Sequence, residues 1–92
     1  MQNKFTTRYK RNDDILATEM DGVTIMMSIE EGKYFELSTV STRIWELLES
    51  PLSINDICES LLSEYDVSEE KCRLEVINHL EELKYKKIIL PV

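Results

Sequence analysis

The dipeptide Asp21-Gly22 is the feature that most limits the folds open to this chain. It lies between two segments whose patterns predict β-strands, at about 15–20 and 23–29. Asp-Gly between strand patterns is the strongest short-range signal for a two-residue β-hairpin. Within the second segment the apolar residues at 23, 25, 27 and 29 alternate with Thr24, Met26 and Ser28. This period of two means that one face of the strand is expected to pack on the core.

A third strand is expected at residues 33–37, after a turn at Glu30-Glu31-Gly32. Its alternation places Phe35 and Leu37 on one face and Tyr34 and Glu36 on the other. The three strands therefore form a small antiparallel meander. The third strand is expected at the edge of the sheet, because the chain next turns into a helix.

Three helices follow, and each begins at a residue that caps helix N-termini well. The caps are Ser38 or Thr39, then Ser53, then Ser68, and Pro51 separates the first helix from the second. Apolar residues recur at helical spacing in each, for example Ile44, Leu47 and Leu48 in the first; in the third they are Cys72, Val76, Ile77, Leu80 and Leu83. The order predicts an α+β fold, a three-stranded antiparallel sheet followed by three helices, winged helix-turn-helix-like.

The 92 residues are enough for one domain, which we place at residues 13–92. Residues 1–12 are polar and basic and are expected to form a flexible N-terminal arm. A net charge of −7 disfavours nucleic acid and anionic membranes as partners. Cys58 and Cys72 are expected to be buried thiols in a reducing compartment. Without a signal-peptide pattern or a membrane-length apolar segment, a cytoplasmic location is expected.

The motifs of catalysis and metal binding are not found. Both glycines fall in turns, so no glycine-rich phosphate loop exists. Cys72 and His79 lie on one side of the third helix, but two turns separate them by about 10 Å, too far for a nucleophile–base pair. Cys58 does not supply the close cysteine pairing of a zinc site. We therefore expect a protein that is not an enzyme and has no catalytic residue, cofactor or metal.

The ordered motifs resemble those of PqqD-type proteins. Phe35-Glu36-Leu37-Ser38 is followed by Arg43-Ile44-Trp45-Glu46-Leu47-Leu48, as in the aromatic-x-Leu-Asn and Ile-Trp-x-Leu-Leu signature of that family. The likeness continues through both later helices and covers about residues 15–90. Three positions depart from the pattern: Ser38 replaces the usual Asn, Glu75 the usual Asp, and His79 an aromatic residue.

The resemblance implies a RiPP recognition element, the module that binds the leader of ribosomally made, post-translationally modified peptides. The segment 17–22 makes the chain most similar to the stand-alone version of lasso-peptide clusters, which delivers a precursor to a separate leader peptidase. In such proteins the leader adds as a strand to the third strand, beneath the third helix, without catalysis. The implied peptide-binding residues are Lys33, Tyr34, Phe35, Glu36, Leu37, Cys72, Glu75, Val76, His79 and Leu83.

Two other functions stay open from the residues alone. The second and third helices are arranged as the reading pair of a winged-helix DNA-binding regulator, although the third helix mixes acidic and basic residues. An uncovered third strand also fits a general protein–protein interaction domain, including self-association through its edge. The sequence does not identify the precursor peptide, the enzyme that receives it, the affinity or the oligomeric state.

Overall fold

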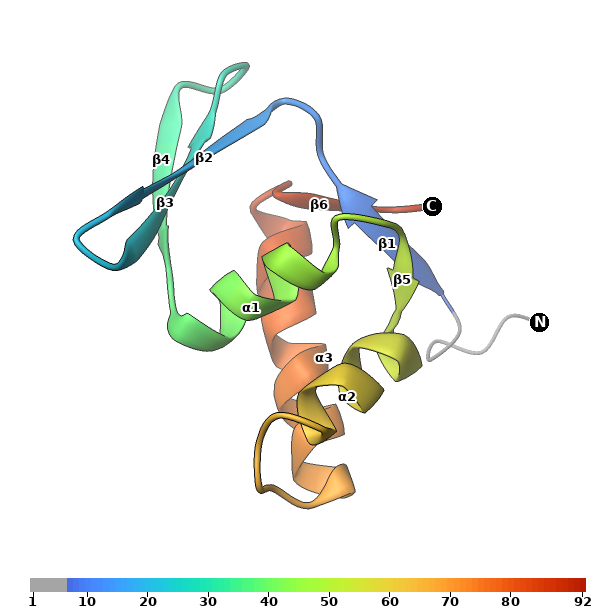
Figure 1. Ribbon diagram of the computed structural model, residues 1–92. Coiled ribbons are helices and arrows are strands. Elements are labelled where there is room, and N and C mark those ends of the chain that lie inside the picture. The colour runs from blue at the N-terminus through green and yellow to red at the C-terminus, as the bar shows by residue number, and fades with distance from the viewer. Residues whose placement is uncertain (1–6) are drawn as a thin grey trace.

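The computed structural model describes residues 7–92 and confirms the α+β prediction (Figure 1). One antiparallel sheet has the order β2-β3-β4 and is followed by three helices; a second has the order β5-β1-β6. The strands of the first sheet are β2 (Ile15–Met20), β3 (Val23–Ser28) and β4 (Lys33–Leu37). The helices are α1 (Thr39–Leu47), α2 (Ile54–Leu62) and α3 (Glu69–Tyr85), and the second sheet comprises β1 (Arg8–Arg11), β5 (Leu52–Ser53) and β6 (Ile89–Pro91).

The second sheet differs from the sequence expectation of a flexible arm over residues 1–12. Arg8–Arg11 form β1, the central strand between β5 and β6, and Tyr9 is buried in the core. The sequence does not predict this strand, because Tyr9 is the sole apolar residue of the segment and its neighbours Arg8 and Lys10 are charged. Residues 1–6 of the expected arm lie outside the described residues. The apolar tail after α3 becomes β6, the partner of β1.

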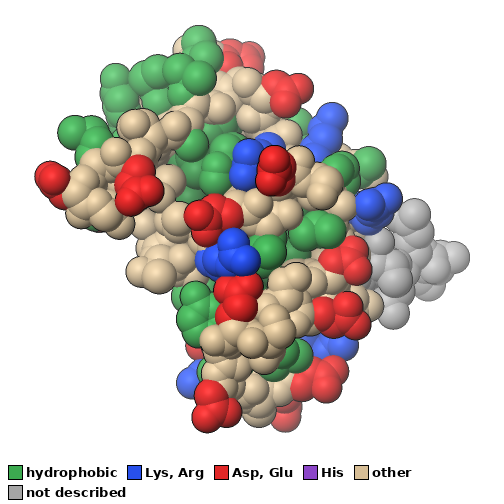
Figure 2. Space-filling view, viewed as in Figure 1, with side chains coloured by type: hydrophobic (Ala, Val, Ile, Leu, Met, Phe, Trp, Pro, Cys, Tyr) green, Lys and Arg blue, Asp and Glu red, His purple; other side chains and the backbone are tan. Residues whose placement is uncertain are grey.

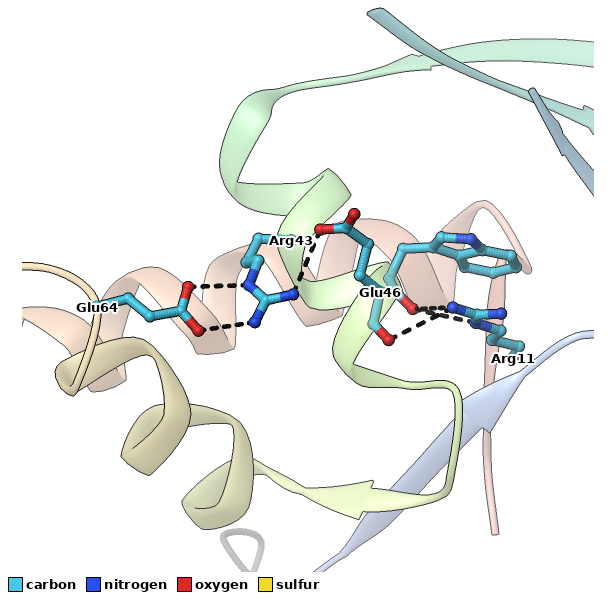
Figure 3. Close-up of polar contacts among 5 residues, drawn as sticks. Arg11, Arg43, Glu46 and Glu64 are labelled. Carbon is cyan, nitrogen blue, oxygen red and sulfur yellow. Dashed lines mark hydrogen bonds and ion pairs between the residues drawn. The ribbon is translucent and has the colours of Figure 1, made fainter. Parts of the chain in front are cut away.

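Arg11 at the end of β1 ties this second sheet to α1 (Figure 3). Its Nε and Nη2 donate to the carbonyl oxygen of Trp45 at 3.0 and 2.8 Å, and its guanidinium lies 4.5 Å from the centre of the Trp45 ring. Figure 3 also shows Arg43 of α1 reaching Glu64, just past α2, with two hydrogen bonds of 2.8 Å. This pairing lowers the pKa of the Glu64 carboxyl and raises that of Arg43.

The predicted helix starts are confirmed. The hydroxyl oxygens of Ser38, Ser53 and Ser68 each accept a hydrogen bond from the backbone N–H three residues ahead. At α2 the Asp56 carboxylate in turn accepts from the Ser53 N–H, which completes a capping box. These hydrogen bonds to Ser53 lower the pKa of Asp56. Each helix therefore begins where its serine satisfies an otherwise unpaired N–H group.

The face of β3 that packs on the core is the one with Met26 and Ser28, not the one with most of the apolar residues. Met26 is completely buried and Ser28 is 4% exposed, whereas Ile29 just past the strand is 58% exposed. The Ser28 hydroxyl is satisfied by donating to the Asp14 carboxylate at 2.9 Å. Register with the neighbouring strands decides the face, because Met26 lies opposite Phe35, which packs against the core.

The core is built mainly from the helices and β6. Ile44 of α1, Ile57 of α2, Leu80 and Leu83 of α3, and Ile89 of β6 are all at most 2% exposed. Cys58 and Cys72 are buried and free, as predicted. Within residues 7–92 none of the helices combines the length and the apolar character that a bilayer crossing requires.

Candidate functional site

The outer edge of β4 has no strand beside it in the described part of the chain, which confirms that the third strand lies at the edge. The turn between β2 and β3 determines which backbone groups point toward this edge. Asp21 and Gly22 both have positive φ, 53° and 80°, as a type I′ turn requires. The flanking residues Met20 and Val23 then exchange hydrogen bonds, and bonded and non-bonded pairs alternate from there along the ladder.

This alternation turns the N–H and C=O groups of the even-numbered β3 residues toward β4. Their register partners on β4 are Lys33, Phe35 and Leu37, which use their backbone groups to hold the sheet together. The backbone groups of Tyr34 and Glu36 point the other way, toward the open edge. Two N–H donors and two C=O acceptors thus face outward from a short strand, in the spacing that a further strand pairs with.

The side chains of β4 alternate as the sequence predicts. Tyr34 is 70% exposed and Glu36 is exposed, whereas Leu37 is 7% exposed and Phe35 packs against the core. The ammonium group of Lys86, the C-cap residue just past α3, lies 5.3 Å from the centre of the Phe35 ring. The inner face of β4 therefore lies beside α3, and the backbone edge stays uncovered.

The first turn of α1 brings α3 to the end of β4. The Ser41 hydroxyl and His79 Nδ1 lie 2.8 Å apart, in a hydrogen bond between the two helices. Near this contact is an apolar pocket of about 80 Å³ lined by Val40, Leu61, Tyr65, Val67, Cys72, Glu75 and Val76. Since Val40 follows β4 by three residues, this pocket lies just past the end of the open edge.

A second, wider hollow lies on the other side of Tyr65. Its volume is about 380 Å³, and it runs over Glu36 and Leu37 to the start of α1 and to Arg43. Tyr65 lines both hollows. The end of β4 is therefore flanked by an apolar pocket and by an open polar depression.

The structure places the predicted α3 residues at different depths. Cys72, Val76 and Leu83 are each at most 4% exposed, so they support the surface from beneath. Glu75 is exposed at the pocket and His79 is half-buried. Cys72 and Val76 come together with Glu75 in the pocket wall, whereas Leu83 lies in the core further along the helix.

Val40, Tyr65 and Val67 line the pocket, but sequence reasoning did not identify them as site residues. A signal existed at 65–67, where a connector between two helices carries an aromatic and a branched apolar residue. Lys86 was also missed. It contacts Phe35 and donates to Glu82 at 2.8 Å, which lowers the pKa of the Glu82 carboxyl.

The chemistry around the buried thiols does not point to a nucleophile. Burial raises the pKa of the Cys58 thiol to about 11, so this group stays protonated at neutral pH. The Cys72 Sγ donates toward the Cys58 carbonyl oxygen at 4.0 Å, which joins α2 to α3. No group of three His, Cys, Asp or Glu side chains within residues 7–92 is placed to hold a metal ion.

Comparison with known proteins finds matches among families and solved structures but no significant match among curated proteins. The chain is similar to TbiB1 in complex with the TbiA(beta) leader peptide, with 26% identity and a TM-score of 0.78 over 87% of this chain and 93% of that one. It is also similar to lasso peptide synthetase B1 complexed with the leader peptide, with 21% identity and a TM-score of 0.77 over 90% and 98%.

The family match covers most of the chain. It includes β4, all three helices and the first residue of β6, and therefore both the open edge and the apolar pocket. The matching family model is described as coenzyme PQQ synthesis protein D (PqqD) and spans residues 24–89 of the 92, so this chain belongs to the PqqD family.

Proposed function

We propose that this chain is a non-catalytic RiPP recognition element that binds the leader segment of a precursor peptide as an added strand on β4. It then presents the bound peptide to a separate modifying or leader-cleaving enzyme, with the lasso-peptide type favoured. The observation that carries this proposal is the open edge of β4, where the backbone groups of Tyr34 and Glu36 face outward. The similar TbiB1 structure holds a leader peptide, which supports the same use of the shared fold.

The backbone supplies register and much of the affinity in such a complex, because main-chain hydrogen bonds do not depend on the peptide's side chains. Four outward-facing groups at about 0.5–1.5 kcal/mol per hydrogen bond give a moderate contribution. A leader that is disordered when free also has to become ordered, which reduces the net affinity.

Side chains supply the specificity. The apolar pocket past the end of β4 fits an apolar side chain of the peptide, with Val40 and Val76 on its walls. Glu75 at the same pocket favours a peptide with Lys or Arg near that side chain, and Glu36 adds negative charge at the wider hollow beside the end of β4. The other residues implied by the resemblance hold these groups in place from β4 and from α3. They are Lys33, Phe35, Leu37, Cys72, His79 and Leu83.

The setting of the protein fits this role. Two free thiols, Cys58 and Cys72, suit a reducing compartment such as the cytoplasm, where ribosomal precursors are made. The charge of α3 does not support the DNA-binding alternative. Its first turn exposes Glu69 and Glu70, which would repel the phosphates that a reading helix approaches.

Proline substitution on the edge tests the proposal. The probe is a fluorescently labelled synthetic leader of a precursor peptide, found by searching the reading frames on either side of this chain's gene, and it is titrated by anisotropy. Glu36→Pro removes an outward N–H and places a ring where the peptide would pair, so binding should weaken at least tenfold, equivalent to about 1.4 kcal/mol.

The matched control is Glu19→Pro on β2, the opposite edge of the same sheet. The N–H of Glu19 also faces outward, because its neighbours Thr18 and Met20 are the residues bonded to β3. This variant should bind the leader within twofold of wild type. Equal binding by the wild type and both proline variants would contradict strand addition at β4.

A further inference from the structure

Three lysines gather where the open edge of β4 begins. Lys33 is exposed, and the strand period of two places its side chain on the same face as Phe35, toward α3. The Lys86 ammonium lies 5.3 Å from the centre of that Phe35 ring, and the Lys87 Nζ lies 3.9 Å from the Glu31 carboxylate in the turn before β4. We call these three lysines the lysine end of the edge.

The lysine end has positive charge to spare. Lys86 donates to Glu82 at 2.8 Å, and Lys87 has Glu31 beside it. Lys33 forms no salt bridge within residues 7–92. A carboxylate that approached the edge beside the Phe35 ring would therefore meet the ammonium of Lys33, which has no ion-pair partner there, and that of Lys86, whose side chain is held in place.

The other end of the edge, near α1, lacks such a surplus. Glu75 lines the apolar pocket there, and Glu36 and Glu46 line the wider hollow. Arg43 in that hollow is already paired with two carboxylates, those of Glu46 at 3.4 Å and Glu64 at 2.8 Å. Figure 2 shows Asp and Glu side chains near both ends of the sheet, so the basic residues are what distinguishes one end of the edge from the other.

The backbone of β4 does not decide which way an added strand runs. Tyr34 and Glu36 each turn one N–H and one C=O toward the edge, and such groups pair with a parallel or an antiparallel strand. The direction therefore depends on side chains. A peptide laid in the wrong direction would carry a carboxylate to Glu75 instead of to the lysine end, where like charges would repel.

We propose that Lys33 and Lys86 bind an Asp or Glu side chain of the leader and thereby set the direction in which the leader lies along β4. This inference rests on the proposed function. Strand geometry gives the spacing, because Lys33 to Leu37 spans about 13 Å and the apolar pocket lies just beyond. The carboxylate and the apolar side chain both face α3, so they are an even number of residues apart, about four or six.

The test exchanges charges between the protein and the labelled leader, with binding measured by anisotropy at about 0.05 M salt, where screening is weak. The full chain carries Lys33→Glu or Lys86→Glu, and the leader carries Lys in place of the acidic residue at the expected spacing. Lys84→Glu is the matched control. It makes the same change of charge at an exposed residue that lies about 200° around the helix from Lys86. Thermal unfolding confirms that each variant is folded.

Lys33→Glu and Lys86→Glu should each weaken leader binding at least fivefold, whereas Lys84→Glu should stay within twofold of wild type. The leader with Lys in place of the acidic residue should bind the wild type weakly and should regain at least threefold in affinity with Lys33→Glu. Unchanged binding by both variants overturns the inference, as does equal weakening by Lys84→Glu or a lack of rescue by the charge exchange.

A nitroxide label on the leader measures the direction itself. Placed beside the acidic residue, the label should broaden the amide signal of Lys33, and placed beside the apolar residue it should broaden that of Val40. The reverse pattern, or a bound leader that has no Asp or Glu at the expected spacing, overturns the inference. Absence of leader binding by the wild type would instead reject the proposed function.

Discussion

The ammonium group of Lys86 lies 5.3 Å from the centre of the Phe35 ring, and this contact joins the C-terminal end of α3 to the middle of β4. The same ammonium donates to Glu82 one turn earlier, at 2.8 Å. Lys86 thereby holds the helix beside the sheet from the inner face of β4. The backbone edge of β4 stays open, because the contact uses only the Phe35 side chain.

Replacing Lys86 by Met keeps the apolar stem and removes the charge. The pKa of Glu82, which Lys86 holds below its usual range, should rise toward that range. A carboxyl with a lowered folded pKa adds stability above its unfolded pKa and loses it as pH falls through the folded pKa. Both groups are partly exposed, so the loss of stability near neutral pH should stay below about 1 kcal/mol. Carboxyl-carbon NMR titration measures the shift.

Lys84→Met is the control for this change. Lys84 lies in the last turn of the same helix and forms no salt bridge within residues 7–92. The Glu82 titration should therefore remain as in the wild type. A Glu82 pKa that is the same in Lys86→Met as in the wild type would show that the Lys86–Glu82 ion pair does not persist in solution.

Tyr9 connects β1 to the core, and its loss should destabilise the protein strongly. Tyr9 is 7% exposed and lies opposite Leu52 of β5 and Pro91 of β6. Tyr9→Ala should cost about 3 kcal/mol, as large-to-small changes of buried aromatic residues do. Lys10→Ala, an exposed neighbour on the same strand, should change stability by less than about 0.5 kcal/mol. Urea unfolding measures both, and equal stabilities would contradict the place of β1 in the fold.

Cys58 should react slowly with thiol reagents while the protein is folded. Its side chain is buried and its pKa is raised to about 11, so little thiolate forms at pH 8. Because the unfolded chain ionises this thiol at lower pH, stability should decline as pH rises from about 9 through the folded pKa. Reaction with Ellman's reagent with and without denaturant measures the difference. Rapid modification of both cysteines without denaturant would be inconsistent with a buried α2–α3 contact.

The apolar pocket beside Val40 should be needed for leader binding. Val40→Phe adds a ring to a pocket of about 80 Å³, so the peptide's apolar side chain should be excluded and leader binding should weaken at least fivefold. Leu74→Phe, on an exposed position of α3, should leave binding unchanged. Anisotropy titration compares them, and full leader affinity in Val40→Phe would remove the pocket from the binding site.

Much of the fold is predictable from local signals. The Asp21-Gly22 turn and the three serine caps act over a few residues, and each forms as predicted. β1 was not predictable in this way, because its partners in β5 and β6 lie far along the chain and only Tyr9 is apolar. The core face of β3 depends on register with β4, which places Met26 rather than Ile25 against the helices.

The candidate site was predictable as an edge strand but not in its detail. Lys33–Leu37 were expected to bind as a group, whereas the hairpin register separates Tyr34 and Glu36, which face outward, from Phe35, which bonds to β3. The pocket was missed because Val40 and Val67 come from separate segments that only the packing of α1 against α3 brings together. The local signal for the pocket was the apolar connector at 65–67, whereas the facing of Tyr34 and Glu36 depends on the register of the whole sheet.

Hydrogen–deuterium exchange of the β4 amides, read by NMR with and without saturating leader, tests strand addition most directly. In the free protein the amides of Tyr34 and Glu36 should exchange quickly and that of Phe35 slowly, because only Phe35 bonds to β3. On saturation with leader, the Tyr34 and Glu36 amides should become protected at least tenfold. Leader binding that leaves both of these amides exchanging at their free rates would contradict the account.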